Sequence, residues 1–226
     1  RRPPRSTLFP YTTLFRSQLQ RAVDVAGHHA AVQAGRWSAG PDFCFALREL
    51  TELHGRTLAI LGSGAIGSAV ARIAGGFGMR VVRVQVPGST STGRMPLAEA
   101  LPQADAVSLH CPLAPATARL VDARFLALMK PGALLINTSR GGLVDEAALA
   151  AALASGRLGG AALDVLSQEP PSPDHPLLHP APAWADRLWL TPHLAWMTIE
   201  ARTRLVDEAV ANLRAFLAGA RRNRVE

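Results

Sequence analysis

Short apolar runs alternate with longer helical patterns along most of the chain. Apolar runs at 57–61, 106–110, 133–137 and 160–165, with the mixed segment 80–86 and the short run 188–190, are typical of strands in a parallel sheet. Helical patterns occupy 65–77, 96–101, 122–129, 145–155 and 199–217. Alternation of strands and helices at this spacing predicts an α/β fold with a doubly wound parallel sheet.

The first seventeen residues do not follow this pattern. Residues 1–17 have no clear helical or strand periodicity, and residues 7–17 (TLFPYTTLFRS) resemble the translation of a sequencing adapter. A targeting peptide is the competing interpretation, because arginine and serine occur there without acids, but an apolar core and an amphipathic helix are both missing. We expect residues 1–17 to be non-native, and an alanine-rich helix to run from Gln18 to Gly35.

Composition narrows the class of protein. The chain has 226 residues, of which 48% are hydrophobic, which is enough for a buried core and excludes a disordered protein. Cys44 and Cys111 are its only cysteines, so a disulfide scaffold and a cysteine-rich zinc site are excluded. No apolar run is long enough to span a bilayer. We therefore expect a soluble protein of a reducing compartment, the cytoplasm.

The net charge of +7 lies mainly at the two ends of the chain. Arg1, Arg2, Arg5 and Arg16 precede the first acidic residue, and more arginines follow residue 220. A nucleic-acid-binding protein carries its positive charge as a patch on the folded domain. We therefore expect no nucleic-acid partner.

A glycine-rich turn follows the first predicted strand and opens the next helix. In Gly62-Ser63-Gly64-Ala65-Ile66-Gly67, the first glycine permits a tight turn, the second lets a pyrophosphate approach the backbone, and the third allows close helix–strand packing. The helix N-terminus stabilises phosphate charge. The alternative is a structural glycine turn, but this context predicts a dinucleotide-binding (Rossmann) domain.

The residue that would contact the adenosine ribose is unusual. A site that prefers NAD carries Asp or Glu at the end of the second strand, whereas this chain has Gln85. A glutamine can bond a ribose hydroxyl without repelling a 2′-phosphate. Arg83 and Arg94 lie nearby and either attract such a phosphate or are simply solvated, so both NAD and NADP remain open.

Three polar residues follow three successive strands. Arg140, Glu169 and His193 lie just beyond the predicted strands that end near 137, 165 and 190, where parallel sheets bind their ligands. Singly, they also fit a surface arginine or helix cap, a solvated acid and a half-buried histidine. Together they supply a guanidinium for a substrate carboxylate, an imidazolium as proton donor and a carboxylate that orients it. This set fits the reduction of a carbonyl group.

Five blocks that contain these residues resemble the D-isomer-specific 2-hydroxyacid dehydrogenases. They are LGSGAIG (61–67), ADAVSLHCPL (104–113), MKPGALLINTSRGGLVDEAAL (129–149), GGAALDVLSQEPP (159–171) and LTPHLAW (190–196). SPDHPLL (172–178), HLAWMTIEARTRL (193–205) and the tail from Arg222 to Val225 are similar to the glycerate dehydrogenase (hydroxypyruvate reductase) branch. The resemblance implies hydride transfer between NADH or NADPH and hydroxypyruvate or glyoxylate, giving D-glycerate or glycolate.

The resemblance also implies roles for individual residues. Arg140 would bind the substrate carboxylate, Glu169 would pair with the proton donor His193, and Asp164 would face the nicotinamide carboxamide. No metal is expected. The residues expected to bind the dinucleotide are Gly62, Gly64, Ala65, Ile66, Gly67, Gln85, Cys111, Thr138, Ser139, Arg140, Asp164 and His193.

The resemblance further predicts a divided chain. Residues 18–40 would be the remnant linking helix of a truncated substrate domain, 41–193 the dinucleotide-binding domain, and 194–226 a helix that returns to the substrate domain. The rest of that smaller domain would be missing, so we expect dinucleotide binding with little or no turnover. The full-length protein would be a homodimer. The alternative is a protein that senses dinucleotides and presents a surface to partners, as corepressor-like relatives do.

Overall fold

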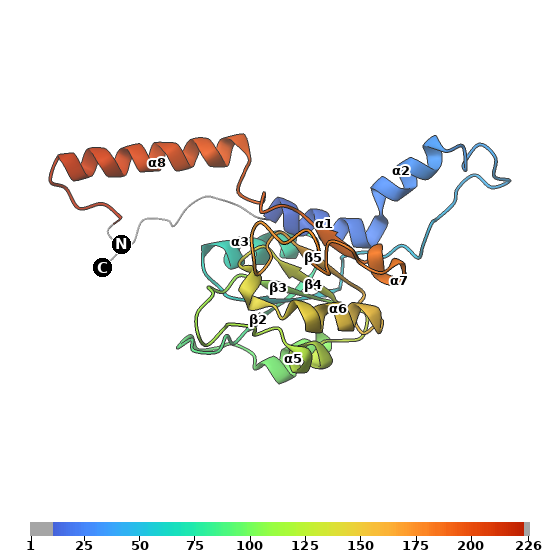
Figure 1. Ribbon diagram of the computed structural model, residues 1–226, viewed down its shortest axis with the longest axis horizontal. Helices are drawn as coiled ribbons and strands as arrows, with labels where there is room; N and C mark the ends of the chain where they lie inside the picture. Colours follow the sequence, from blue (N-terminus) through green and yellow to red (C-terminus); the bar gives the residue numbers. More distant parts are fainter. Residues whose placement is uncertain (1–10, 224–226) are drawn as a thin grey trace.

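The computed structural model describes residues 11–223 and contains a six-stranded, fully parallel sheet (Figure 1). Its strand order is β2-β1-β3-β4-β5-β6, so the order reverses between β1 and β3. Arg1, Arg2, Arg5, Arg224 and Val225 lie outside the described residues. The strands are β1 (Thr57–Leu61), β2 (Arg80–Val84), β3 (Ala106–Leu109), β4 (Leu134–Asn137), β5 (Gly160–Leu163) and β6 (Leu188–Leu190). The predicted doubly wound α/β fold is confirmed.

Helices cover both faces of the sheet and separate two apolar cores. One core joins the sheet to side chains of α5 and α6, and the other joins it to α1 and α3. Figure 1 shows α5 and α6 beneath the sheet and α1 and α3 above it. The helical elements are α1 (Tyr11–Val23), α2 (Val25–Gln33), α3 (Ala65–Gly76), α4 (Leu97–Ala100), η1 (Leu101–Gln103), α5 (Ala123–Leu128), η2 (Gly141–Leu143), α6 (Glu146–Ala154), α7 (Pro182–Ala185) and α8 (Ile199–Leu217).

Local sequence explains where several helices begin. Asp122 accepts a hydrogen bond from Phe125 N at 2.8 Å and Asp145 accepts one from Ala148 N at 3.2 Å, which caps α5 and α6. Thr198 caps α8 in the same way. Each cap fixes the start of a helix that follows a strand: α5 follows β3, α6 follows β4 and α8 follows β6.

The predicted single helix from Gln18 to Gly35 is wrong. The backbone breaks at Asp24, which has φ 52° and separates α1 from α2. The buried Asp24 carboxylate accepts hydrogen bonds from Gln20 Nε2 at 2.6 Å, Gly27 N at 3.1 Å and Arg48 Nη2 at 2.9 Å. These bonds stabilise the left-handed backbone, which short Asp side chains tolerate better than most residues.

The expectation that residues 1–17 lack helical structure is wrong for residues 11–17, which form the start of α1. Phe15 is buried against the sheet, with its ring centroid 5.3 Å from that of Phe77. Phe15, Gln18 and Ala22 are all buried and share one face of α1, because their spacing follows the helical period. The non-native origin of the segment stays a prediction.

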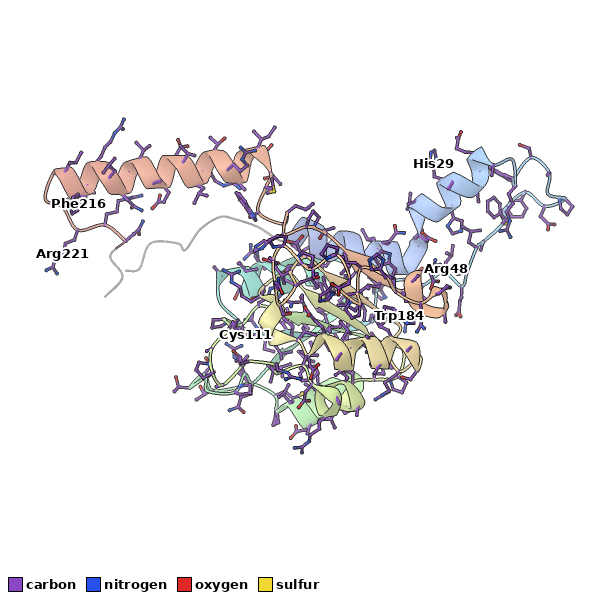
Figure 2. The ribbon with its side chains drawn as sticks, in the orientation of Figure 1. His29, Arg48, Cys111, Trp184, Phe216 and Arg221 are labelled. Carbon is purple, nitrogen blue, oxygen red and sulfur yellow. The ribbon has the colours of Figure 1, made fainter. Side chains whose placement is uncertain are left out.

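Helices α2 and α8 extend away from the sheet in different directions (Figure 1). In α8 only Ala201 is buried, and Phe216 projects from it far from the body of the domain (Figure 2). Large exposed apolar residues of α8 are Ile199, Leu205, Val206, Val210, Leu213, Phe216 and Leu217. Within residues 11–223, no helix combines the length and the apolar character that a membrane crossing requires.

Candidate active site

The glycine-rich turn lies between β1 and α3, where the strand order reverses. Gly62 has φ 99°, and a Cβ there would lie 2.5 Å from the His110 carbonyl and 2.6 Å from Cys111 N. A Cβ on Gly67 would overlap the Gly62 carbonyl oxygen. A Cβ on Gly64 would meet nothing within 4 Å. Two glycines are therefore required by packing, whereas Gly64 faces open space at the N-terminus of α3. Of the residues that follow, Ala65 is exposed and Ile66 packs against the apolar core.

The loop after β4 is shaped by a buried amide. The Asn137 side chain donates to Arg140 O at 2.9 Å and accepts from Ser139 N at 3.0 Å. Ser139 Oγ donates to Cys111 O at 2.9 Å, which joins this loop to the end of β3. Asn137 was not among the predicted site residues, because an asparagine at a strand end has no distinctive spacing.

His193 and Glu169 are brought together as predicted from the sequence. His193 Nδ1 lies 2.7 Å from Glu169 Oε2, and Glu169 Oε1 accepts a hydrogen bond from Leu166 N at 3.0 Å. The two side chains are 41% and 37% exposed. Since Nδ1 faces the carboxylate, Nε2 of the imidazole is directed elsewhere and is available to a ligand.

Arg140 lies at the same edge of the sheet, directly after the β4 loop. Its Nη1 donates to Ser139 O at 2.7 Å, and the side chain is exposed. The next residue, Gly141, packs so closely on the Leu166–Ser167 peptide that a Cβ would overlap it. The Arg140 loop and the turn that carries Glu169 are therefore in direct contact.

The Asp164 carboxylate is directed into the loop that carries His193. It accepts hydrogen bonds from Leu194 N at 3.0 Å, from Ala195 N at 2.9 Å and from the Thr191 hydroxyl. His193 itself has φ 50°, and its N–H donates to Asp164 O at 2.8 Å. The hydrogen bonds of the buried Asp164 therefore hold the strained backbone of His193 in place. A contact with nicotinamide stays a prediction.

Gln85 lies at the exposed edge of the sheet, next to the arginines singled out from the sequence. Gln85 N donates to Met95 O and Met95 N donates to Arg83 O, both at 2.9 Å, so residues 94–96 extend this edge. Arg72, Arg83 and Arg94 line a cleft of about 770 Å³ together with Glu99. Within the described part of the chain, none of the three arginines forms an ion pair.

Two polar groups at the end of β3 are held neutral by burial. Burial raises the pKa of the Cys111 thiol, and burial lowers the pKa of His110 to about 4. Figure 2 shows Cys111 in the body of the domain at the end of the sheet. A neutral thiol is a poor nucleophile, so Cys111 contributes packing and its backbone carbonyl.

The residues present fit a dinucleotide. Gly64 leaves the backbone of the turn accessible, and the Thr138 hydroxyl is buried without a hydrogen-bond partner in the protein. A buried hydroxyl without a partner is costly, so this orphan points to a ligand group that completes it. Over residues 11–223, no group of three or more His, Cys, Asp or Glu side chains is arranged to hold a metal ion.

Comparison with known proteins gives consistent matches. The model of the D-isomer specific 2-hydroxyacid dehydrogenase, NAD binding domain, matches residues 17–195. A putative 2-hydroxyacid dehydrogenase of Haemophilus influenzae is 43% identical over 184 residues, which are 80% of this chain and 58% of that protein. The glycerate dehydrogenase of Methylorubrum extorquens is 42% identical over 196 residues, which are 87% of this chain and 61% of that protein. The chain thus spans about three-fifths of the length of these curated relatives.

Solved structures with a similar fold also match this chain over most of its length. The TT0316 protein from Thermus thermophilus superposes with a TM-score of 0.79 at 38% identity, covering 97% of this chain and 69% of that one. An NADPH-dependent glyoxylate/hydroxypyruvate reductase from Sinorhizobium meliloti, in complex with NADP and malonate, superposes with a TM-score of 0.75 at 30% identity. That match covers 92% of this chain and 63% of the reductase.

Proposed function

The chain belongs to the D-isomer specific 2-hydroxyacid dehydrogenase family, and on that premise we propose that it is the dinucleotide-binding part of a hydroxypyruvate or glyoxylate reductase. The complete enzyme would convert these 2-oxo acids into D-glycerate or glycolate with NADH or NADPH. Relatives named glycerate dehydrogenase, hydroxypyruvate reductase and glyoxylate reductase support this substrate class.

The observation that carries the proposal is the 2.7 Å contact between His193 Nδ1 and Glu169 Oε2. The carboxylate fixes the orientation of the ring, so Nε2 can deliver a proton to the oxygen of the substrate carbonyl. In the reverse direction Nε2 accepts the proton of the substrate hydroxyl. Arg140 binds the substrate carboxylate through its guanidinium.

The dinucleotide would be held along the carboxyl edge of the sheet. Its pyrophosphate would meet the backbone of Gly62–Gly67 at the N-terminus of α3. Thr138 and Ser139 would border it from β4, Cys111 from β3, and Asp164 and His193 from the loops after β5 and β6. When bound, the nicotinamide supplies or accepts the hydride.

Several features support acceptance of NADPH as well as NADH. Gln85 carries no charge to repel a 2′-phosphate, and Arg83 and Arg94 lie beside it at the edge of the sheet. Arg72 lines the same cleft from α3. We therefore infer that the arginines raise the affinity for the phosphorylated cofactor relative to a site with a carboxylate at position 85.

We also infer that this chain turns over slowly on its own. The exposure of the His193 and Glu169 side chains leaves water in contact with the proton donor. In the complete enzyme the part of the relatives that this chain does not match would close this side. The exposed apolar residues of α8 support burial of that helix by the same part or by a second subunit of a homodimer. A cytoplasmic location accords with the two unpaired cysteines.

The test is hydroxypyruvate-dependent oxidation of NADH and of NADPH, followed by nicotinamide absorbance. It is run on this chain and on a fusion that adds the part of the Methylorubrum extorquens glycerate dehydrogenase that this chain does not match. The fusion should turn over, and His193→Gln should abolish its activity. His179→Gln is the matched control, because the His179 ring contacts the Pro173 carbonyl oxygen and is not part of the His193–Glu169 pair. A fusion that binds dinucleotide without turnover would instead favour a dinucleotide-sensing protein.

A further inference from the structure

We propose that Glu146 is a positioning residue, which holds the turn that carries Glu169 and thereby fixes the orientation of the His193 ring. The inference rests on the proposed role of His193 as proton donor. Glu146 does not touch His193; it acts through Ser167 and the turn that leads to Glu169.

The Glu146 carboxylate grips a single residue of that turn with both of its oxygens. Oε1 accepts a hydrogen bond from Ser167 N at 2.7 Å, and Oε2 accepts one from Ser167 Oγ at 2.6 Å. Glu146 is the first residue of α6, just after the capping residue Asp145. A backbone and a side-chain bond from the same residue fix both the place and the orientation of the Leu166–Ser167 peptide.

The preceding peptide unit, Val165–Leu166, is bound to the Glu169 carboxylate. Leu166 N donates to Glu169 Oε1 at 3.0 Å, and Glu169 Oε2 contacts His193 Nδ1 at 2.7 Å. Two consecutive backbone N–H groups therefore donate to two different carboxylates. Leu166 N donates to Glu169, and Ser167 N donates to Glu146. Because the two peptide units share Leu166, movement of either would shift the Glu169 carboxylate relative to the imidazole.

Two further contacts fix Glu146 and the turn. His175 Nε2 lies 3.1 Å from Glu146 Oε2, and His175 Nδ1 accepts a hydrogen bond from the N–H of the buried Leu177 at 3.2 Å. Because Nδ1 accepts, the ring proton is on Nε2 and is donated to Glu146. Gly141 closes the other side of the turn, with no room for a Cβ against the Leu166–Ser167 peptide.

Such support is needed because the catalytic pair itself is open to solvent. Side chains that are 41% and 37% exposed are not held by packing, so their geometry depends on the backbone from which they extend. Hydrogen bonds weaken steeply when distance and angle depart from their optimum. The Glu146–Ser167 contact is the anchor that ties the Glu169 turn to a helix of the domain.

The test reads the tautomer of His193 by imidazole ¹⁵N NMR, in alkaline solution, where a histidine ring is neutral. A neutral ring carries its proton on Nδ1 when that nitrogen donates to a carboxylate. The His193 signal is assigned with His193→Gln. The measurement uses the chain as it is and needs neither turnover nor cofactor, so it is independent of the activity assay.

We expect the wild-type chain to hold mainly the Nδ1–H form, and Glu169→Gln to lower the ratio of Nδ1–H to Nε2–H about tenfold, the size of a hydrogen bond to a charged group. Glu146→Gln and Glu146→Asp should each lower this ratio about threefold. Glu146→Asp keeps the negative charge but moves the carboxylate away from Ser167. It therefore distinguishes the effect of the hydrogen bonds from the effect of the charge acting over a distance. Glu200→Gln removes a charge from the first turn of α8 and should change nothing.

A wild-type ratio in both Glu146 variants, together with a loss in Glu169→Gln, would overturn the positioning role and leave the proposed function intact. A loss in Glu146→Gln alone would show that the charge acts rather than the contact, and would also overturn it. If the wild-type ring carried its proton on Nε2, both the pairing with Glu169 and the inference would fail. Backbone amide spectra of each variant verify that the fold is retained.

Discussion

Two glycines of the same turn should respond to alanine in opposite ways. Gly62 has φ 99° and leaves no space for a Cβ, which would lie 2.5 Å from the His110 carbonyl. Gly64 has φ −67° and open space around it. Gly62→Ala should therefore damage folding, whereas Gly64→Ala should damage only the binding of the dinucleotide.

The expected sizes follow from the geometry. At Gly62 a left-handed backbone costs alanine about 1–2 kcal/mol, and the overlap with the β3 backbone adds about 1–3 kcal/mol. At Gly64 alanine is a poorer N-cap by about 0.5–1 kcal/mol, but it reduces the entropy of the unfolded chain by a similar amount. The free energy of unfolding should thus fall by about 2–5 kcal/mol in Gly62→Ala and change by less than about 0.5 kcal/mol in Gly64→Ala.

Urea unfolding followed by circular dichroism measures the free energy of unfolding of each variant. Fluorescence titration with NADH and NADPH measures the affinity for the dinucleotide. Because the methyl group of Gly64→Ala would occupy the space open to a pyrophosphate, the affinity should fall more than tenfold, or about 1.4 kcal/mol. Equal affinity for the wild-type chain and Gly64→Ala would refute the placement of the phosphate at this turn. Equal stability of Gly62→Ala would refute the packing argument.

Three further predictions follow from the same geometry. Gly141→Ala should lower the activity of the fusion enzyme at least tenfold, because a Cβ must displace the Glu169 turn. The nearest neighbour of a Cβ on Gly142 is the flexible Leu113 side chain, so Gly142→Ala should be mild, and equal effects of the two variants would contradict this reasoning. Gln85→Asp should lower the NADPH/NADH ratio of kcat/KM at least tenfold, and an unchanged ratio would show that position 85 does not contact the ribose. Burial lowers the pKa of His110 to about 4, so the unfolded chain binds a proton that the folded chain excludes between about pH 6.5 and 4. The free energy of unfolding should therefore decrease by up to about 3 kcal/mol as the pH is lowered through that window. His110→Gln should remove most of this pH dependence, as measured by urea titrations at each pH.

The sheet was predictable because its signals are local. The strands, buried on both faces except at the edges, leave apolar runs that the sequence displays directly, and β6 was predicted to the residue. The carboxyl ends of parallel strands share one edge, so Arg140, Glu169 and His193 could be placed together without a structure. The short helix α7 was missed, since a helix of four residues between β5 and β6 is too short to show a period.

What could not be predicted depends on single side chains that act at a distance in the sequence. At the break, the Asp24 carboxylate also bonds the distant Arg48, and nothing in the helical pattern around residue 24 signals this contact. Glu146 resembled an ordinary acid in the first turn of a helix, and only the structure brings Ser167 onto its carboxylate. Phe15 was set aside with its segment, although its spacing from Ala22 matches a buried helix face.

Each proposed catalytic side chain extends from a loop that a less exposed polar group holds. Asn137 shapes the loop of Arg140, Glu146 grips the turn of Glu169, and Asp164 holds the loop of His193. Asn137 and Asp164 are buried, and a buried polar group is costly unless it is hydrogen-bonded, so their bonds are lost only together with part of the fold. The half-buried Glu146 carboxylate can be changed while the fold is retained. The three loops therefore keep their geometry although the side chains they carry are exposed. It follows that dinucleotide binding and the orientation of His193 should persist in this chain even where turnover requires the rest of the enzyme.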